Sequence, residues 1–399
     1  MNRLTVRDLD VRGKRVFVRV DFNCPIGDDG QVSDDTRIVA ALPTLRYLSE
    51  KGGRLILASH LGRPKGAPEP RYSMAPVAAR LAQRLKLPVV TAGDCIGADV
   101  EAAATALPEG GFLMLENLRF HPGEETNDPE FARALARSAD LYVNDAFGTA
   151  HRAHASTVGI TRFLSPSAAG FLMEKELKYL GQAVGQPKRP FWAILGGAKI
   201  SGKIDVIGHL FDRVDGFLIG GGMAFTFLSA GGHAIGQSLL EPDRLELAAD
   251  LMKRAGEKNV PIVLPVDLVE ARGPKGSDEH RAAGGIEIAD GWMGVDIGPH
   301  TVDEFRRRLA RAGTILWNGP MGIFEEPPYD TGTLAVARLL ADATKGGAVT
   351  IVGGGDSAAA ISAAGLEDAV THVSTGGGAS LEFLEGKELP GVAALSVRP

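Results

Sequence analysis

Short apolar runs rich in β-branched residues alternate with longer amphipathic stretches along this chain, and that alternation limits its possible folds more than any other feature. The strand-like runs cover residues 15–20, 54–58, 112–115, 141–143, 191–195, 217–219, 261–264, 314–317 and 348–352. The helix-like stretches cover residues 38–51, 75–86, 129–138, 244–258, 302–311 and 333–343. Such alternation is typical of repeated βαβ units, in which helices cover both faces of a parallel sheet. We therefore predict an α/β protein.

A helix-like segment near the middle of the chain predicts a domain boundary. Residues 170–181 put Met173, Leu177 and Leu180 on one helical face, and a Gly/Pro-rich stretch at 185–190 follows. At 399 residues the chain exceeds the size at which a single core stops growing. We expect two doubly wound, Rossmann-like parallel-sheet domains, at 1–170 and 191–382, joined by a hinge helix and linker at 171–190.

Charge and cysteine content exclude several classes of function. The net charge of -6 argues against a surface that binds nucleic acid or anionic lipid. No run of about 18 apolar residues is present to span a membrane, and the charged N-terminal segment does not resemble a signal peptide. Cys24 and Cys95 are the only cysteines, which fits a reducing compartment. We expect a cytoplasmic protein without nucleic-acid or membrane partners.

Cationic side chains follow the predicted strands of the first half. Ligands of open parallel sheets bind beyond the carboxyl ends of the strands, so the residues after each strand are candidates for a site. Four successive strand ends each supply an arginine, and four guanidinium groups in one cleft would repel each other unless an anion lay among them. We therefore predict a site for a polyanionic small molecule, without a base or nucleophile of its own. The residues that follow these strands include Asp21, Asn23, Arg37, His60, Arg63, Arg119 and Arg152.

A His-x-x-His pair, His151 and His154, follows the fourth strand. Such a pair can bind a metal, but no third ligand lies at a suitable spacing. We do not predict a metal site there.

Glycine-rich loops follow the strands of the second half. Residues 196–204 nearly match the phosphate-binding P-loop, but Ile204 stands where that motif needs Ser or Thr. Lys199 and Lys203 are four residues apart, which predicts that they share a helical face near a helix N-terminus, where anions are favoured. We therefore predict an anion site of another kind.

Further glycine runs occupy 220–222, 353–355 and 376–378. Gly353 to Ala358 reads as a variant of the dinucleotide fingerprint, yet no acidic residue ends a strand about 20 positions later, as a nicotinamide ribose would need. Asp356, beside bare backbone amides, suits a Mg²⁺ held against phosphates.

Together these segments resemble the phosphoglycerate kinase family. In the first half the resemblance rests on RVDFNCP at 19–25, SHLGRP at 59–64, LENLRF at 115–120 and VNDAFGTAHR at 143–152. In the second half it rests on GGAK at 196–199, WMGVDIGP at 292–299, WNGPMGIFE at 317–325, GGGD at 353–356 and STGGGAS at 374–380. The motifs occur in order from about residue 10 to LPGVAAL at 389–395. The departures are Cys24, where Val is usual, and Ser357, where Thr is expected.

The resemblance implies roles for both halves of the chain. The first-half candidates would hold 3-phosphoglycerate or its bisphosphate, and the tail at 383–399 would return to the first domain. The second half would bind ATP or ADP with Mg²⁺. Its nucleotide-binding residues would be Gly196, Gly197, Lys199, Lys203, Gly220, Gly221, Asn318, Glu325, Gly353, Gly354, Gly355, Asp356 and Ser357, with the metal on Asp356 and the ribose on Glu325.

The implied reaction is 1,3-bisphosphoglycerate + ADP ⇌ 3-phosphoglycerate + ATP, in glycolysis and gluconeogenesis, by a monomer whose domains close around an in-line transfer. The attacking carboxylate is already ionised near neutral pH, which explains why no general base is evident. Arg37, Lys199, Gly354 and Gly355 would stabilise the transferring phosphoryl group. Two alternatives remain open from the residues themselves: a nicotinamide dehydrogenase and a non-catalytic nucleotide-binding or scaffold protein. Cys24 would be either an oxidation-sensitive thiol or a buried inert one.

Overall fold

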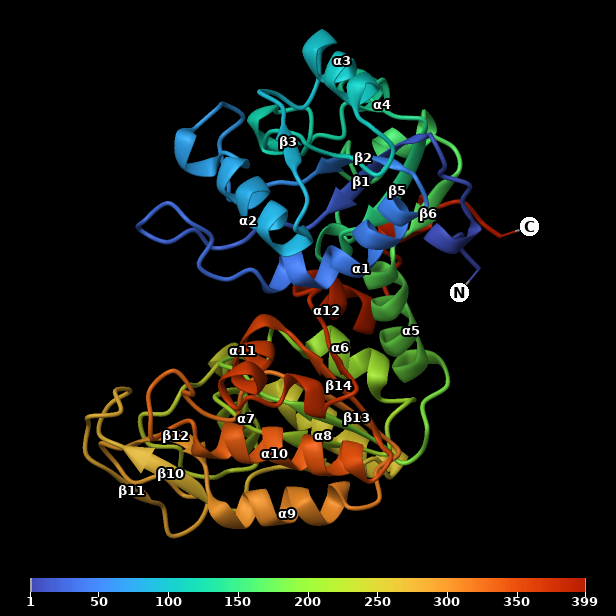
Figure 1. The fold of residues 1–399 in the computed structure, drawn as a ribbon. Coiled ribbons are helices and arrows are strands. Elements are labelled where there is room, and N and C mark those ends of the chain that lie inside the picture. The colour runs from blue at the N-terminus through green and yellow to red at the C-terminus, as the bar shows by residue number, and fades with distance from the viewer. Residues whose placement is uncertain (1, 399) are drawn as a thin grey trace. The chain divides into compact units, whose positions relative to one another are not determined.

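The computed structural model describes residues 2–398, which form two compact units. Among the described residues, the first unit comprises 2–178 and 388–398, and the second comprises 179–387. Each unit contains a six-stranded parallel sheet flanked by helices (Figure 1). The prediction of an α/β protein built from two parallel-sheet halves is therefore confirmed.

The sheet of the first unit has the strand order β3-β4-β2-β1-β5-β6. Strand β1 lies inside this sheet, paired with β2 on one side and β5 on the other, and its residues from Val16 to Val20 are buried. The strands are β1 (Arg15–Val20), β2 (Arg54–Ala58), β3 (Val89–Thr91), β4 (Phe112–Met114), β5 (Leu141–Asp145) and β6 (Ser167–Ala169).

The described part of the first unit also contains α-helices, of which α5 continues into the second unit, and short 3₁₀ turns. The helices are α1 (Thr36–Glu50), α2 (Ala75–Leu85), α3 (Ala98–Ala106), α4 (Pro129–Ala136), α5 (Phe171–Gly185) and α13 (Pro390–Ala393). The 3₁₀ turns are η1 (Val6–Asp8), η2 (Pro70–Tyr72), η3 (Leu118–Phe120), η4 (Phe147–Thr149) and η5 (Gly159–Arg162). Helix α13 brings the C-terminal segment back to this unit, where Gly391 N donates to Ala150 O at 2.8 Å.

Helix α5 contains the boundary between the two units and continues to Gly185. The predicted end at Gly181 was therefore too early. Ala183, in the added turn, is fully buried, so packing extends the helix past a glycine that favours termination.

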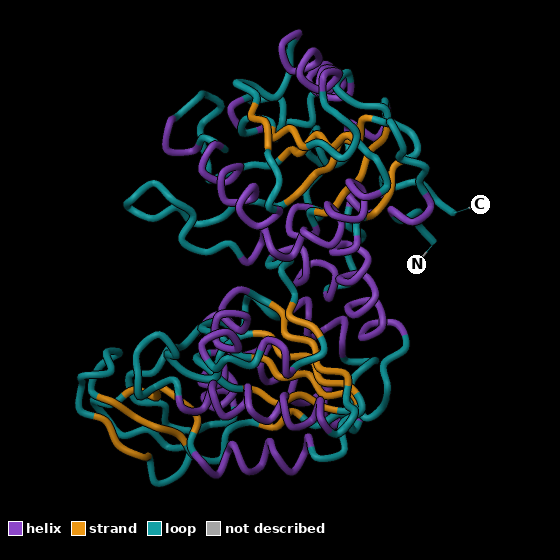
Figure 2. The backbone as a smooth tube through the Cα atoms, in the orientation of Figure 1, coloured by secondary structure: helices purple, strands orange, loops and turns teal. Residues whose placement is uncertain are grey.

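The main sheet of the second unit has the order β15-β14-β13-β7-β8-β9. Its strands are β7 (Phe191–Leu195), β8 (Gly216–Ile219), β9 (Ile262–Val263), β13 (Thr314–Asn318), β14 (Val349–Gly353) and β15 (His372–Val373). Central strands β7 and β13 are buried along their whole length, as expected for a parallel sheet covered on both faces. Figure 2 shows these strands in orange among the purple helices.

The helices of this unit are α6 (Ile204–Leu210), α7 (Met223–Ala230), α8 (Leu245–Lys258), α9 (Pro299–Leu309), α10 (Thr331–Lys345), α11 (Gly355–Ala363) and α12 (Gly378–Leu384), with 3₁₀ turns η6 (Pro242–Arg244) and η7 (Glu367–Ala369). Helices α9 and α10 begin two or three residues before their predicted starts. In α9 the extension is due to Pro299 at the first helical position, where its fixed φ favours helix initiation.

A second, antiparallel sheet was not predicted. It has the order β11-β10-β12 and consists of β10 (Leu268–Ala271), β11 (His280–Ala282) and β12 (Met293–Ile297). Beneath it lies a small separate core that includes Phe225, Leu228 and Trp292. This sheet forms one wall of the apolar slot described below.

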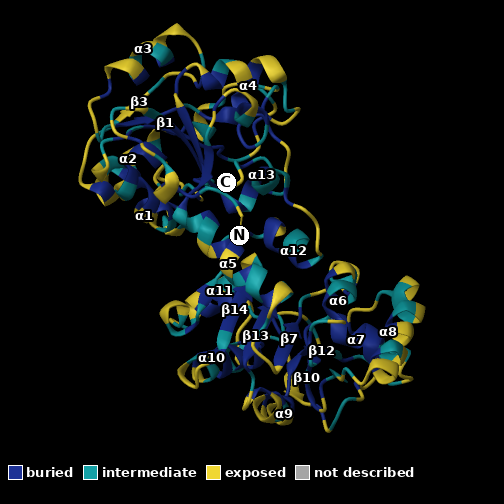
Figure 3. Ribbon diagram, turned by 90° about the vertical axis from the view of Figure 1, so that its right-hand side faces the viewer, coloured by how far each residue is buried: buried dark blue, intermediate teal, exposed yellow. Residues whose placement is uncertain are grey.

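The cores lie along the central strands, such as β7 and β13, which are dark blue in Figure 3. The first unit packs β1, β2, β4 and β5 against α1 and α2, and the second packs β7, β13 and β14 against α9, α10 and α11. No helix among residues 2–398 is both long and apolar enough to cross a membrane.

Candidate functional site

The loops after β1 and β2 of the first unit place a carboxylate, an amide and a histidine beside several arginines. Arg37, in the first turn of α1, forms an ion pair with Asp21. Burial opposes ionisation of Asp21, but the charges of Arg37 and its other cationic neighbours outweigh it and lower the carboxyl pKa. Asn23 Oδ1 accepts a hydrogen bond from Gly62 N at 2.8 Å, which ties the two loops together.

His60 is buried among positive charges. Its pKa lies well below the usual value because burial disfavours the charged ring, with Arg19 and Arg119 adding repulsion. Arg19 NH2 lies 3.3 Å from His60 Nδ1. Since a guanidinium can only donate, Nδ1 accepts and the proton is on Nε2. His60 is therefore a neutral hydrogen-bond donor held in a fixed orientation.

Arg119 lies in η3 and is only 5% exposed. Its NH1 donates to Gly62 O at 2.8 Å and its NH2 lies 3.1 Å from Glu125 Oε1. Its Nε is buried with no hydrogen-bond partner in the described residues. Burial and the nearby charge of Arg152 both disfavour the cation and lower the Arg119 pKa. An incoming anion would relieve both penalties.

The two remaining predicted arginines are exposed. Arg63 follows Gly62 directly, and Arg152 donates through Nε to His151 Nε2 at 3.1 Å. Buried His154, three residues after His151, has its pKa lowered to about 4 by burial and by Arg19, Arg119 and Arg152. Arg19, Arg119 and Arg152 thus lie close enough for the charges of the other two to act on Arg119, and such a cluster of positive charge suits an anion.

Arg19 lies beside His60 in this site, and the strand-end reasoning did not assign it. It lies inside β1, is 1% exposed, and donates through Nε to Ser156 Oγ at 2.8 Å. Ser156 Oγ in turn donates to buried Glu124 Oε1 at 2.5 Å. A charged residue within an apolar strand must have a buried partner, and that rule could have singled out Arg19 from the sequence.

Cys24 follows Asn23 and is 3% exposed. Burial raises the pKa of its thiol to about 12, so the thiolate that oxidation requires is scarce.

The second unit contains a polar chamber of ≈ 320 Å³ at the carboxyl ends of β7, β13 and β14. Lys203 Nζ donates to Asn318 Oδ1 there, while Asn318 Nδ2 is buried with no partner in the described residues. Burial lowers the Lys203 pKa to about 8, although Asp356 and Glu385 act in the opposite direction. The chamber is lined by Gly196, Gly197, Ala198, Lys199, Lys203, Asn318, Gly319, Gly354, Gly355, Asp356, Ser357, Gly377, Gly378 and Leu381.

The prediction that Lys199 and Lys203 share a helical face is wrong. Helix α6 begins at Ile204, and only residues 201–203 before it form a turn. Both lysines nevertheless line the chamber, and Lys199 is exposed.

Two glycines make the floor of the chamber possible. Gly319 has φ +98°, and a Cβ there would lie 2.2 Å from Gly196 O. Gly354 has φ +90° and precedes α11, whose N-terminal residues Gly355 and Asp356 face the chamber. Ser357 Oγ accepts from Gly319 N at 2.6 Å, so this hydroxyl holds the floor in place.

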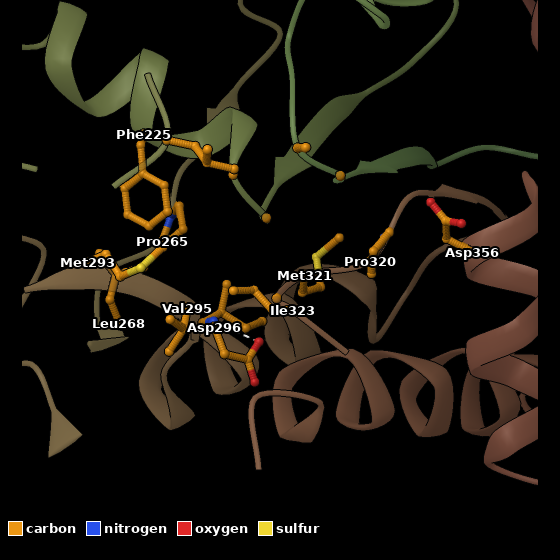
Figure 4. A pocket seen from close by; sticks show the side chains of 18 of the residues that line it. Phe225, Pro265, Leu268, Met293, Val295, Asp296, Pro320, Met321, Ile323 and Asp356 are labelled. Atoms are coloured by element: carbon orange, nitrogen blue, oxygen red, sulfur yellow. Dashed lines mark hydrogen bonds between the residues drawn. The ribbon is translucent and has the colours of Figure 1, made fainter. Parts of the chain in front are cut away.

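An apolar slot of ≈ 210 Å³ adjoins the chamber, and Gly197, Ala198 and Asp356 line both cavities. Figure 4 shows Phe225 and Met293 at the end of the slot opposite Asp356. Gly221 and Glu325 also line it. Its shape and composition suit a flat, mostly apolar group joined to an anionic one.

Two predicted glycines lie outside these linings. Gly220 packs behind the slot, where a Cβ would lie 2.5 Å from Met321 Sδ. Gly353 ends β14, and a Cβ there would lie 3.4 Å from Asn318 Nδ2.

Comparisons with known proteins agree with this geometry. The family model described as phosphoglycerate kinase matches residues 6–387. Proteins named phosphoglycerate kinase from Chlorobaculum tepidum and Prosthecochloris aestuarii are 58% and 57% identical over 396 residues, which is 99% of this chain and 100% of each relative.

Solved structures show the same similarity. The phosphoglycerate kinase of Coxiella burnetii has a TM-score of 0.89 at 40% identity, and that of Pyrococcus horikoshii has 0.84 at 32%. Each comparison covers 98% of both chains. The chain therefore belongs to the phosphoglycerate kinase family.

Proposed function

We propose that the cationic site of the first unit holds 3-phosphoglycerate or 1,3-bisphosphoglycerate, and that the chamber and slot of the second unit hold ATP or ADP. As a member of its family, the chain is a glycolytic kinase that transfers a phosphoryl group between ATP and 3-phosphoglycerate. The polar chamber carries the assignment of the nucleotide site. It combines a desolvated lysine, a buried amide donor without an acceptor and a helix N-terminus, and all three favour a bound phosphate chain.

The first unit supplies the grip on the phosphoglycerate. Arg63, Arg119 and Arg152 hold the phosphate that is not transferred, because guanidinium groups make paired hydrogen bonds to phosphate oxygens. Asp21, Asn23 and neutral His60 bind the hydroxyl and orient the molecule. Arg37 binds the carboxylate of 3-phosphoglycerate and the phosphoryl group that this carboxylate accepts.

The second unit supplies the grip on the nucleotide. The base occupies the apolar slot beside Gly197 and Gly221, backed by Gly196 and Gly220, and Glu325 accepts hydrogen bonds from the ribose. Lys203, Asn318 and the backbone from Gly353 to Gly355 bind the phosphate chain, with Ser357 supporting the loop beneath it.

The donor set of the chamber fits Mg²⁺. This ion is usually held by one or two carboxylates together with substrate phosphates, and Asp356 is a single exposed carboxylate lining both cavities. Asp356 would hold the metal, which when bound neutralises negative charge on the phosphates.

The chemistry that remains is positioning and charge stabilisation. The 3-phosphoglycerate carboxylate is ionised at neutral pH, so no residue needs to remove a proton from the nucleophile. Arg37, Lys199 and the N–H groups of Gly354 and Gly355 stabilise the charge of the transferring phosphoryl group. The transfer requires the two ligands to meet in line, so we propose that the domains at 1–170 with 383–399 and at 191–382 close about the hinge helix and linker at 171–190.

A coupled assay with purified protein tests this proposal. Turnover should require 3-phosphoglycerate, ATP and Mg²⁺ together and should stop when EDTA removes the metal. Turnover that persists in EDTA would contradict the role of Asp356. Tight binding of NADH without any turnover would contradict the whole assignment.

We also propose that the enzyme acts as a cytoplasmic monomer, as its resemblance to the family implies. Sedimentation at several concentrations checks the oligomeric state, and a concentration-dependent rise in mass would contradict it.

A further inference from the structure

Asp94, Cys95 and His121 form a cluster outside the proposed substrate and nucleotide sites. Among residues 2–398, these three place one ligand atom each, a carboxylate oxygen, the thiol sulfur and a ring nitrogen, within 4.8 Å of one another. Asp94 and Cys95 belong to the loop between β3 and α3, and His121 follows η3. We propose that this cluster is a binding site for a divalent transition metal of the zinc type.

The geometry is close to that of such a site. Zinc takes sulfur, nitrogen and oxygen ligands at about 2.0–2.3 Å in a tetrahedral arrangement, which separates neighbouring ligand atoms by roughly 3.5 Å. His121 Nε2 and Asp94 Oδ1 are 2.7 Å apart and share a hydrogen bond. A metal bound between these two atoms in place of the shared proton would need to separate them by only about 0.8 Å more. The fourth position would be taken by water.

The ligands are already held in place. Cys95 N donates to Asp94 Oδ1 at 2.6 Å, and Glu116 N donates to Asp94 O at 3.3 Å, so the loop is fixed to the end of β4. The His121 ring stacks on Phe131, with centroids 5.1 Å apart. Since these contacts restrain the loop and the ring before a metal arrives, little conformational entropy remains to be lost on binding.

The site has a buried wall and an open side. Cys95 is 1% exposed, whereas the side chains of Asp94 and His121 are 51% and 29% exposed. A metal ion can therefore enter from solvent and meet the sulfur at the base of the site. The ligand types favour zinc-like ions over Mg²⁺ or Ca²⁺, because a thiolate and an imidazole are softer ligands than oxygen.

Binding at Cys95 exchanges one bond for another. Burial raises the pKa of the Cys95 thiol well above its usual value, so the thiolate forms only as the metal displaces the proton. The S–H bond breaks, a sulfur–metal bond forms, and the thiol proton leaves to solvent. The thiolate and the Asp94 carboxylate carry two negative charges, which balance the two positive charges of the metal. No oxidant or further reactant is needed.

Metal here would restrain the segment that presents Arg119, two residues before His121. Because the inference depends only on ligand geometry, it does not rest on the proposed function. A failure of either can therefore be recognised separately.

Titration of the metal-free full-length protein with Co²⁺ tests the proposal. Tetrahedral cobalt bound to a thiolate gives an intense near-ultraviolet charge-transfer band together with visible d–d bands. We expect these bands to saturate at one Co²⁺ per chain and to disappear when Zn²⁺ is added. Their absence in the wild-type protein would overturn the proposal.

Variants locate the ligands. The Cys95→Ser protein should lose the charge-transfer band. The Cys24→Ser protein, which keeps Cys95, should retain the band and serves as the control. His121→Gln leaves the buried Cys95 thiol in place, so it serves if Cys95→Ser does not fold, and it should weaken Co²⁺ binding by about tenfold or more. A charge-transfer band that persists in Cys95→Ser or vanishes in Cys24→Ser would contradict the assignment. Co²⁺ that binds His121→Gln as tightly as the wild-type protein would contradict it too.

Discussion

Lys203 donates a hydrogen bond to Asn318 Oδ1, while Nδ2 of the same Asn318 is buried without a partner in the described residues. A buried donor without an acceptor and a desolvated ammonium group both cost free energy. Both groups line the polar chamber beside the N-terminus of α11. A bound phosphate chain would satisfy all three at once, which is why we propose the chamber as the nucleotide site.

Replacing Lys203 should separate stability from binding. Lys203→Met removes a partly buried charge, so the free protein should gain on the order of 1 kcal/mol of stability. The same change should weaken ADP binding by at least tenfold, because one charge-assisted contact to phosphate is lost. Thermal unfolding with and without ADP measures both effects. Lys253→Met, on the exposed face of α8, is the matched control and should change neither. Equal ADP affinity in Lys203→Met would refute the phosphate role.

Nucleotide affinity should depend on alkaline pH. Because the Lys203 pKa in the free protein is lowered to about 8, its positive charge is lost as pH rises through that value. ADP should therefore bind more weakly at pH 9 than at pH 7, and Lys203→Met should show no such trend. The sign for stability is opposite: the folded pKa lies below the ordinary lysine value of 10.5, so the penalty is present below pH 8 and is relieved as pH rises from about 8 to about 10.5. Isothermal titration of ADP across this range checks the trend, and unchanged affinity would count against it.

Arg37 should matter for the reaction more than for nucleotide binding. Arg37→Ala removes the cation paired with Asp21 in the first unit, and we expect kcat to fall by about 10² or more while the ADP dissociation constant stays the same. Arg46→Ala, on the exposed face of the same helix α1, is the control and should keep normal kcat. Steady-state kinetics and ADP titration supply the two readouts. Near-normal kcat in Arg37→Ala would exclude the catalytic role.

Gly170 should not tolerate a side chain. Asp145 Oδ1 accepts hydrogen bonds from Leu172 N and Met173 N at the start of α5, and a Cβ on Gly170 would lie 2.1 Å from that same oxygen. Gly170→Ala should therefore cost about 2–4 kcal/mol through overpacking and a lost helix cap.

Gly256→Ala is the control for Gly170→Ala, and we expect it to change stability in the opposite direction. Gly256 lies in the exposed interior of α8, and a Cβ added there would meet nothing within 4 Å, so alanine should stabilise by roughly 0.5–1 kcal/mol. Urea unfolding followed by circular dichroism measures both variants. Two unchanged midpoints would show that contact geometry does not govern these sites.

Strongly apolar strands were predictable from the sequence alone. Residues 15–20, 54–58 and 191–195 form strands with the predicted bounds, because fully buried parallel strands are continuous apolar runs. Elements that depend on tertiary pairing were missed. Strand β11 is exposed and polar, and its pairing with β10 is what makes it a strand. Helix α3 buries only Val100 and Ala104, so it carries little amphipathic signal.

In the candidate sites, too, features set by local sequence were predictable, whereas features that depend on tertiary contacts were not. Reasoning from strand ends named Asp21 and His60 as candidates, because the carboxyl ends of parallel strands share one edge. Asn318 was named only through the family resemblance. Arg19 lies within a strand, and its charge in an apolar run is the only local sign that it needs a buried partner. The partner itself, Ser156, is 137 residues away, so no local pattern identifies that contact. The helical spacing of Lys199 and Lys203 misled because turns precede α6. Family membership sets aside the dehydrogenase and scaffold alternatives.

The most direct test of two separate half-sites is calorimetric titration of ADP with Mg²⁺, and of 3-phosphoglycerate, into Lys203→Met and Arg119→Gln. Lys203→Met should lose affinity for ADP and keep normal affinity for 3-phosphoglycerate, whereas Arg119→Gln should do the reverse, and both should lose turnover. If either variant weakened both ligands equally, or if neither variant affected its own ligand, the assignment of the two sites would be wrong.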